Sequence, residues 1–100
     1  MYVGARDPEF AEIVIADAEF DFATVTSAEL EVETPGPTET LSWDWSLDTS
    51  IPGQITLTHV FAADGSDVPR VGPYIVTGWL LTPASRRRVD PVRLTADPYR

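Results

Sequence analysis

The sequence predicts an all-β protein, a sandwich of two antiparallel sheets with about six to seven short strands. Apolar and polar residues alternate with a period of two in several segments, and no window shows a sustained helical period. Nine prolines and six glycines interrupt the chain at short intervals, which is typical of strands joined by turns. A length of 100 residues suits one such domain. We therefore expect a single sandwich over residues 12–100, preceded by an extended arm over residues 1–11.

The first half of the chain predicts three strands. Residues 12–16 form a short apolar run. In residues 28–33 apolar side chains alternate with Glu29, Glu31 and Glu33, which gives one dry face and one wet face, and the segment ends in a Pro-Gly-Pro turn at residues 34–37. Residues 41–46 alternate again and place Trp43 and Trp45 on one face. We expect this third strand to be continuous.

The second half predicts three more strands. Residues 55–61 place His59 on the same face as its apolar neighbours, and residues 73–82 are the most apolar stretch of the chain, with apolar side chains on both faces. Residues 83–88 are expected to form a basic turn, and residues 92–96 the last strand. The inward faces of all these strands supply the expected core: Leu30, Val32, Trp43, Trp45, Leu57, Tyr74 and Val76.

A short signature makes the expected sandwich immunoglobulin-like. The run Gly72-Pro73-Tyr74-Ile75-Val76 has the spacing of a tyrosine corner, in which a tyrosine hydroxyl bonds back to the chain at the start of the penultimate strand. A core tyrosine in an ordinary strand that begins with Gly-Pro is the alternative interpretation. In the first interpretation, one of the tryptophans, Trp43 or Trp45, packs against Val76.

The charge and the residue types exclude several function classes. Sixteen acidic residues against seven arginines give a net charge of −9, which disfavours direct nucleic-acid binding. The apolar runs are too short to cross a bilayer, so no membrane partner is expected. The chain has no cysteine, which excludes disulfides and thiolate metal sites, and its first residues lack the pattern of a signal peptide.

No pattern predicts an enzyme, a metal site or a cofactor. A lone His59 on an apolar face is expected to be a buried, hydrogen-bonded core residue. Asp17, Glu19 and Asp21 have the spacing that opens a calcium loop, but Phe22 stands where the turn glycine belongs. Glu29, Glu31 and Glu33 point to the wet face with no cleft to raise one pKa, so a glycosidase pair is not expected.

The order of features over residues 26–94 resembles a known family. It runs through Thr26-Ser27-Ala28-Glu29-Leu30-Glu31-Val32, Pro35-Gly36, a Trp-bearing strand, Ile55-Thr56-Leu57-Thr58, and Asp67 ahead of Gly72-Pro73-Tyr74-Ile75-Val76. It is similar to the small immunoglobulin-like domains of bacteriophage structural proteins, such as the N-terminal domain of the phage baseplate upper protein. The resemblance implies a non-enzymatic virion protein made in the bacterial host cytoplasm. It would serve as a head decoration, a neck or connector part, or a tail baseplate element.

A virion protein of this kind would contact other virion proteins, copies of itself, or both. The expected interface residues are the aromatic residues of the arm, the outward face around Trp79, and the basic turn: Tyr2, Phe10, Ile75, Trp79, Leu81, Arg86, Arg87 and Arg88. The arm is expected to become ordered on a neighbouring subunit. The alternative function is a carbohydrate-binding or adhesion module, in which Trp43 and Trp45 form an exposed aromatic pair.

Overall fold

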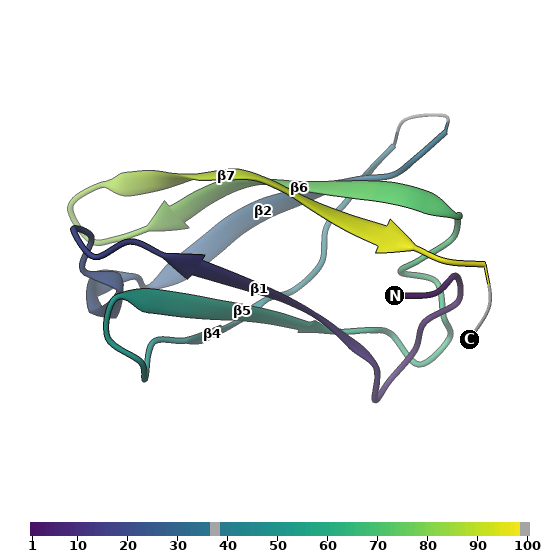
Figure 1. The fold of residues 1–100 in the computed structure, drawn as a ribbon, viewed down its shortest axis with the longest axis horizontal. Helices are drawn as coiled ribbons and strands as arrows, with labels where there is room; N and C mark the ends of the chain where they lie inside the picture. The colour runs from purple at the N-terminus through teal and green to yellow at the C-terminus, as the bar shows by residue number, and fades with distance from the viewer. Residues whose placement is uncertain (37–38, 99–100) are drawn as a thin grey trace.

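The computed structural model describes residues 1–36 and 39–98, and these form two antiparallel sheets packed face to face (Figure 1). One sheet has the order β1-β5-β4, with β1 at Phe10–Ala16, β5 at Gln54–Val60 and β4 at Ser46–Asp48. The other has the order β3-β2-β6-β7, with β3 at Thr40–Leu41, β2 at Ser27–Glu33, β6 at Gly72–Leu81 and β7 at Arg86–Ala96. A 3-10 turn, η1 at Phe22–Thr24, precedes β2. The predicted β-sandwich is confirmed.

The strand order is that of an immunoglobulin-like domain. In such domains strands B, E and D share one sheet while C, F and G share the other. Taken in chain order, β1, β4 and β5 occupy the places of B, D and E, and β2, β6 and β7 occupy those of C, F and G. The short β3 adds a strand beside β2. Connections therefore pass between the sheets, and residues far apart in the sequence meet in one core.

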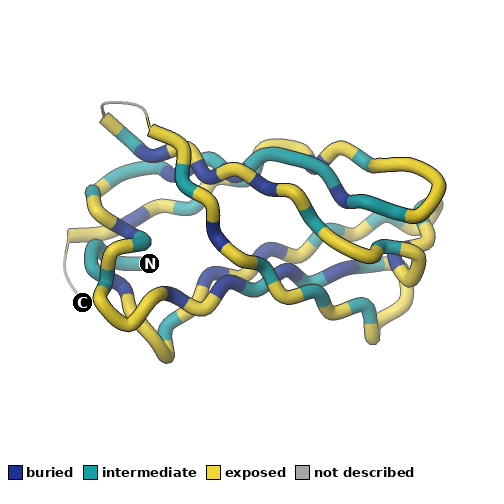
Figure 2. The backbone as a smooth tube through the Cα atoms, turned by 180° about the vertical axis from the view of Figure 1, so that it is seen from behind, coloured by how far each residue is buried: buried dark blue, intermediate teal, exposed yellow. Residues whose placement is uncertain are grey.

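The core lies between the sheets, where the buried positions of both layers face each other (Figure 2). Alternate residues of β5 and β6 supply much of it, because a strand points every second side chain to the same face. Each fully buried Leu, Ile or Phe stabilises the fold by about 1.5–3 kcal/mol through removal of apolar surface from water. Of the core residues proposed from the sequence, Leu30, Val32, Trp43, Leu57, Tyr74 and Val76 are buried and Trp45 is half-buried.

The tyrosine corner is confirmed at the start of β6. Tyr74 is fully buried, and its hydroxyl donates a hydrogen bond to the carbonyl of Arg70 at 2.8 Å. The amide of Arg70 donates one back to the same hydroxyl at 2.9 Å. The two bonds close the β5–β6 connection onto the strand it enters.

The continuous third strand expected over residues 41–46 is wrong. The chain forms β3 in one sheet, crosses at residues 42–45, and forms β4 in the other sheet. The crossing segment carries Trp43 into the core, where its ring stacks on His59 with centroids 4.8 Å apart. The crossing also brings the ring within 5.5 Å of the Phe61 ring and 6.3 Å of the Tyr74 ring, so aromatic packing from both layers favours this path over a continuous strand. Pro37, in the predicted turn before this segment, lies outside the described residues.

The basic turn expected over residues 83–88 is also wrong, because the three arginines belong to strand β7. The turn itself is closed by Thr82 and Ser85, whose backbone atoms are joined by a 2.9 Å hydrogen bond from the Thr82 amide. Strand β7 pairs with β6 from Arg86 onward and shifts register between Val76 and Gly78. Pro91 lies on the β7 side of this bulge, at a sheet edge where its missing N–H costs no ladder bond.

The N-terminal residues pack on their own domain. Ala5 is fully buried, and Tyr2 forms a parallel bridge with Asp97 at the end of β7. The Val3 amide donates to the Asp97 carbonyl at 3.0 Å, and the Gly4 amide donates to the Val68 carbonyl at 2.9 Å. The expected arm over residues 1–11 is therefore held against the sandwich in this structure, and its last two residues begin β1.

Candidate protein interface

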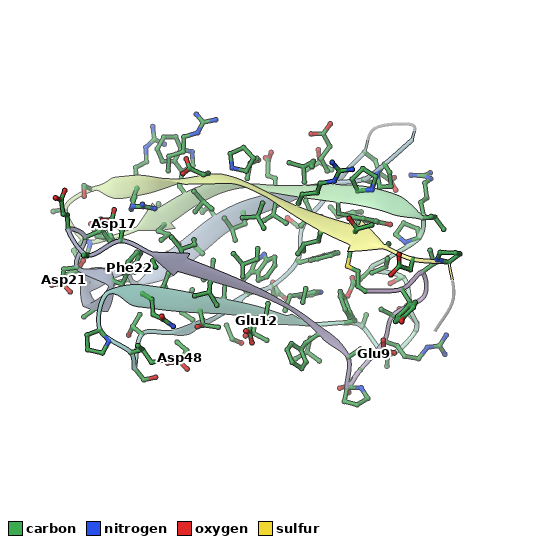
Figure 3. All side chains as sticks on the ribbon, in the orientation of Figure 1. Glu9, Glu12, Asp17, Asp21, Phe22 and Asp48 are labelled. Carbon is green, nitrogen blue, oxygen red and sulfur yellow. The ribbon has the colours of Figure 1, made fainter. Side chains whose placement is uncertain are left out.

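The outer face of the four-stranded sheet carries a stripe of partly exposed apolar and aromatic side chains. Ile75, Thr77, Trp79 and Leu81 alternate with the buried residues of β6 and point away from the core. All four are half-buried. The side chains of this sheet project above β6 and β7 in Figure 3. Because β6 lies between β2 and β7, the stripe runs along the middle of the face.

Opposite charges flank the stripe on its two sides. On β2, Glu29 pairs with Trp79 and Glu33 pairs with Ile75 across the antiparallel ladder. On β7, Arg88 pairs with the same Trp79, and Arg93 with the same Ile75. Two rows therefore cross the sheet in the order acid, apolar residue, base. Arg86 extends the basic side beside Leu81.

The arginines of β7 fold over Trp79. The guanidinium carbon of Arg86 lies 4.1 Å from the centroid of the Trp79 ring, and that of Arg88 lies 5.9 Å away. Such cation–π contacts contribute about 0.5–1 kcal/mol each where water has access. They hold two flexible side chains over a rigid ring, so less conformational entropy is left to lose when a partner binds.

A groove of about 660 Å³ opens beside this stripe. It is lined by β2, β6, β7 and the crossing segment, and its carboxylates come from Glu29, Glu31 and Asp44. Within the described residues β3 pairs only with Val32 and Glu33, so the earlier part of β2 has no strand beside it at this edge. Arg86 and Arg88 line the same groove, so it carries three carboxylates and two guanidinium groups.

Arg87 differs from its two neighbours, because it points to the other side of β7. It pairs with the buried Leu80, and its guanidinium forms a 3.1 Å ion pair with Asp17. The same group lies 5.4 Å from the Phe20 ring and 5.8 Å from the Phe22 ring. Figure 3 shows Asp17 and Phe22 together at this end of the sandwich. Arg87 therefore closes the end of the core and does not lie with Arg86 and Arg88.

The ion pair is one of the interactions that lower the pKa of Asp17. Its pKa is lowered from the usual value, chiefly by the hydrogen bond from the Glu19 backbone amide and then by the bond from Arg87. The distance from that amide to the carboxylate is 3.0 Å. Asp17, with the calcium-like spacing noted above, is thus part of a local turn and an ion pair. Asp21 is used as well, since its carboxylate caps η1 through the Ala23 amide at 3.1 Å.

The two aromatic residues proposed for the arm lie away from the Trp79 face. Tyr2 is half-buried beside Asp97. Phe10 is exposed at the start of β1, opposite the exposed Val60, on the outer face of the three-stranded sheet. The residues proposed from the sequence therefore fall in four places: Tyr2, Phe10 and Arg87 each lie apart, and the structure brings together Ile75, Trp79, Leu81, Arg86 and Arg88.

The single histidine has both ring nitrogens occupied. Nδ1 of His59 lies 2.7 Å from the Asp44 carbonyl oxygen, and Nε2 lies 2.9 Å from a carboxylate oxygen of Asp67. The same Asp67 oxygen accepts a hydrogen bond from the Ala62 amide at 2.7 Å. The ring is buried and joins the crossing segment to the β5–β6 connection. In residues 1–36 and 39–98, no group of three or more His, Asp or Glu side chains is placed to hold a metal ion.

Sequence reasoning missed Arg93 and the role of the β2 glutamates in this face. Arg93 stands five residues beyond the arginine cluster, and only the β6–β7 register places it beside Ile75. Glu29 and Glu33 appear in the sequence as a solvated strand face. The sequence shows that these glutamates share one strand face. It does not show that only β6 separates them from the arginines of β7, because that depends on the order of strands in the sheet.

Comparisons with known proteins identify no relative. No family model, no curated protein and no solved structure matches this chain. Among the described residues no helix is long and apolar enough to span a membrane. The candidate interface therefore rests on the geometry of the sandwich itself.

Proposed function

We propose that this protein is a non-catalytic structural protein of a bacteriophage particle, and that it docks onto neighbouring virion proteins through the outer face of β2, β6 and β7. The observation that carries the docking role is the apolar β6 stripe, which lies between the glutamates of β2 and the arginines of β7. The particle itself is suggested by the resemblance over residues 26–94 to immunoglobulin-like domains of phage structural proteins.

The chemistry of this face suits a protein partner. An apolar strip supplies affinity when it is covered, and the flanking charges supply orientation and reject wrongly placed partners. Trp and Arg are the residue types that most often dominate binding energy at such contacts, and here they stack on each other. The domain as a whole is strongly acidic, so a neighbouring surface with exposed arginines or lysines would be attracted to it over a distance.

The alternative of a sugar-binding module loses the feature that favoured it. Trp43 is buried, with only 5% of its surface exposed, and the half-buried Trp45 packs against the core. Their indole nitrogens are also shielded from water. They therefore do not form an exposed aromatic platform. Trp79 remains the one tryptophan on an outer face, and an arginine covers its ring.

Mass spectrometry of gradient-purified particles from the source culture tests the proposal. We expect peptides of this protein to co-sediment with capsid protein in a fixed ratio. A high ratio would indicate a head decoration, and a low ratio a neck or baseplate ring. Finding the protein free of particles, or binding glycans on an array through Trp79, would overturn the proposal.

A further inference from the structure

Three surfaces outside the core are candidates for a second role: the edge of β1, the exposed Phe10–Val60 pair on the three-stranded sheet, and the outer face of β2, β6 and β7. The first two show no feature that selects an occupant. The third does, because its charges are arranged in order across the sheet. Acids lie on one side of β6 and bases on the other, at the same levels along the strands.

We propose that a second copy of this chain covers the face, related to the first by a twofold axis that runs parallel to β6. The inference deepens the proposed function, on which it rests for assigning this face to protein contacts. Turning one copy by 180° about that axis exchanges the places of β2 and β7 and leaves each level along the strands unchanged. A twofold contact of this kind is self-complementary, since each residue meets its partner twice.

This arrangement places opposite charges together. Glu29 faces Arg88 of the second copy, because both residues pair with Trp79 in their own chain. Glu33 faces Arg93 of the second copy, because both pair with Ile75. The apolar residues on the axis meet their own copies. Each ion pair occurs twice, so the two rows supply four pairs per dimer.

The other twofold arrangement of the same faces is unfavourable. An axis in the interface but perpendicular to β6 would lay β2 on β2, with glutamate against glutamate, and β7 on β7, with arginine against arginine. Like charges in contact cost free energy and exclude wrong partners. The order of charges across the sheet therefore selects one axis. The selected arrangement has one like-charge contact, between Glu31 and Asp90 of the second copy in the bulge, and it occurs twice per dimer. The four opposite-charge pairs at the levels of Trp79 and Ile75 outnumber it.

The groove gives the partner's arginine a place to enter. Glu29, Glu31 and Asp44 line it together with Arg86 and Arg88 of the same chain, so carboxylates outnumber guanidinium groups. In the proposed arrangement β7 of the second copy would lie above β2, where these carboxylates are. A long guanidinium side chain suits a carboxylate-lined hollow, because several donors can be satisfied at once. Arg88 of the second copy lies at the level of Glu29 and is the residue that reaches it.

The size of the face sets the strength of the contact. Strands β2, β6 and β7 have seven, ten and eleven residues, and at a spacing of about 4.8 Å they cover roughly 450 Å² per copy. This area is at the low end of specific interfaces, so we expect a dissociation constant between about 10 μM and about 1 mM. Such a dimer forms where copies are concentrated, as they are on a particle.

Charge reversal with heterodimer rescue tests the arrangement, using sedimentation velocity from about 10 μM to about 1 mM. Either Glu29→Arg or Arg88→Glu places like charges at both Glu29–Arg88 contacts, so each variant alone should dimerise at least about 30-fold more weakly. Mixed together, the two variants restore both contacts. The new arginine on β2 of one chain meets the new glutamate on β7 of the other, and at the second contact the native Arg88 meets the native Glu29. The mixture should therefore form a heterodimer of wild-type strength, a rescue that no effect within a single chain can produce.

Glu12→Arg is the matched control, an exposed strand glutamate on the outer face of the other sheet, and it should leave dimerisation unchanged. Thermal melting checks that each variant is folded. A wild-type chain that stays monomeric over the whole range, or a mixture that fails to recover, would overturn the inference. If the chain is monomeric in solution but present in particles, the proposed function stands and the dimer is wrong. If the chain dimerises as expected but is absent from particles, the dimer stands and the phage function is wrong.

Discussion

The hydroxyl of Tyr74 and the backbone of Arg70 exchange two hydrogen bonds, one in each direction, at the entrance to β6. The bonds satisfy a phenol that is otherwise completely buried. They also fix where the β5–β6 connection ends, and so they set which residues of β6 face outward. The position of Trp79 on the outer face depends on this starting point.

Replacing Tyr74 by phenylalanine should destabilise the fold by about 1–3 kcal/mol, because the Arg70 amide and carbonyl lose their partner while the ring still fills its space. Urea unfolding monitored by tryptophan fluorescence measures the change. Tyr2→Phe is the control, since the Tyr2 hydroxyl makes no hydrogen bond among those found in the described residues. A Tyr74→Phe protein as stable as the wild type would show that the corner does not contribute to stability.

The stability of the protein should fall as the pH rises past about 10. Burial raises the pKa of the Tyr74 phenol, so the folded state holds the neutral form while the unfolded chain releases its proton first. One such group gives a slope of at most about 1.4 kcal/mol per pH unit. The chain has no lysine, so few other groups ionise there. Urea titrations between pH 8 and about 11 should show the slope in the wild type and lose most of it in Tyr74→Phe.

Gly78→Ala should destabilise the protein by about 2–4 kcal/mol. Gly78 has a φ of 152°, and a Cβ there would collide with the Glu29 carbonyl oxygen and approach the Leu30 Cα to 2.9 Å. Both neighbours are backbone of β2, which cannot move without breaking the ladder. Gly53→Ala is the matched control: it also has a positive φ, of 80°, but no atom lies within 4 Å of its Cβ position. It should cost only about 1 kcal/mol. Equal losses at the two sites would contradict the close approach of β2 and β6.

Asp17→Asn should remove a stabilisation that is present near neutral pH and lost in acid. The pKa of Asp17 is lowered in the folded state, so its contribution is complete above the unfolded value of 3.8 and disappears as the pH falls through the folded value. An asparagine still accepts the Glu19 amide bond, so the difference reports the charge facing Arg87. Thermal melts at pH 7 and at about pH 2 measure it. Asp90→Asn, an exposed acid in the bulge, is the control; an equal Asp17 effect at both pH values would contradict the assignment.

Reversing Arg86 and Arg88 together should reduce incorporation into particles at least about tenfold while the domain stays folded, because both side chains are exposed on the proposed docking face. The measure is the ratio of this protein to capsid protein after complementation in infected cells. Arg87→Glu is an instructive comparison, since it should lower the melting temperature through loss of the Asp17 pair and the cover over Phe22. Normal incorporation of the Arg86→Glu/Arg88→Glu protein would rule out a role for these side chains in docking.

The segments of β2 and β5 were predictable because each alternates between a dry face and a wet face, and a period of two matches an extended strand. The segment of β6 was predictable because its apolar side chains on both faces are typical of a central strand. The tyrosine corner was predictable because its geometry needs only a local spacing. The tryptophan segment was not, since alternation at residues 41–46 is equally compatible with one strand and with a crossing that buries Trp43. Nor was the order of charges on the outer face, because it depends on which strands are neighbours, a property that pairing creates and that no single segment contains.

The first and last described parts of the chain run side by side. The amino group of Met1 donates to the Thr95 carbonyl at 3.3 Å, and the Asp97 amide donates to the Met1 carbonyl at 2.8 Å. Figure 1 shows the N label close to the end of β7. Met1 and Asp97 therefore lie together at one pole of the sandwich, and a short Gly-Ser link could join them while the chain is opened at the exposed turn around Gly53. For the same reason the whole sandwich could be grafted into a surface loop of another protein, entering and leaving at one pole and presenting the opposite pole freely.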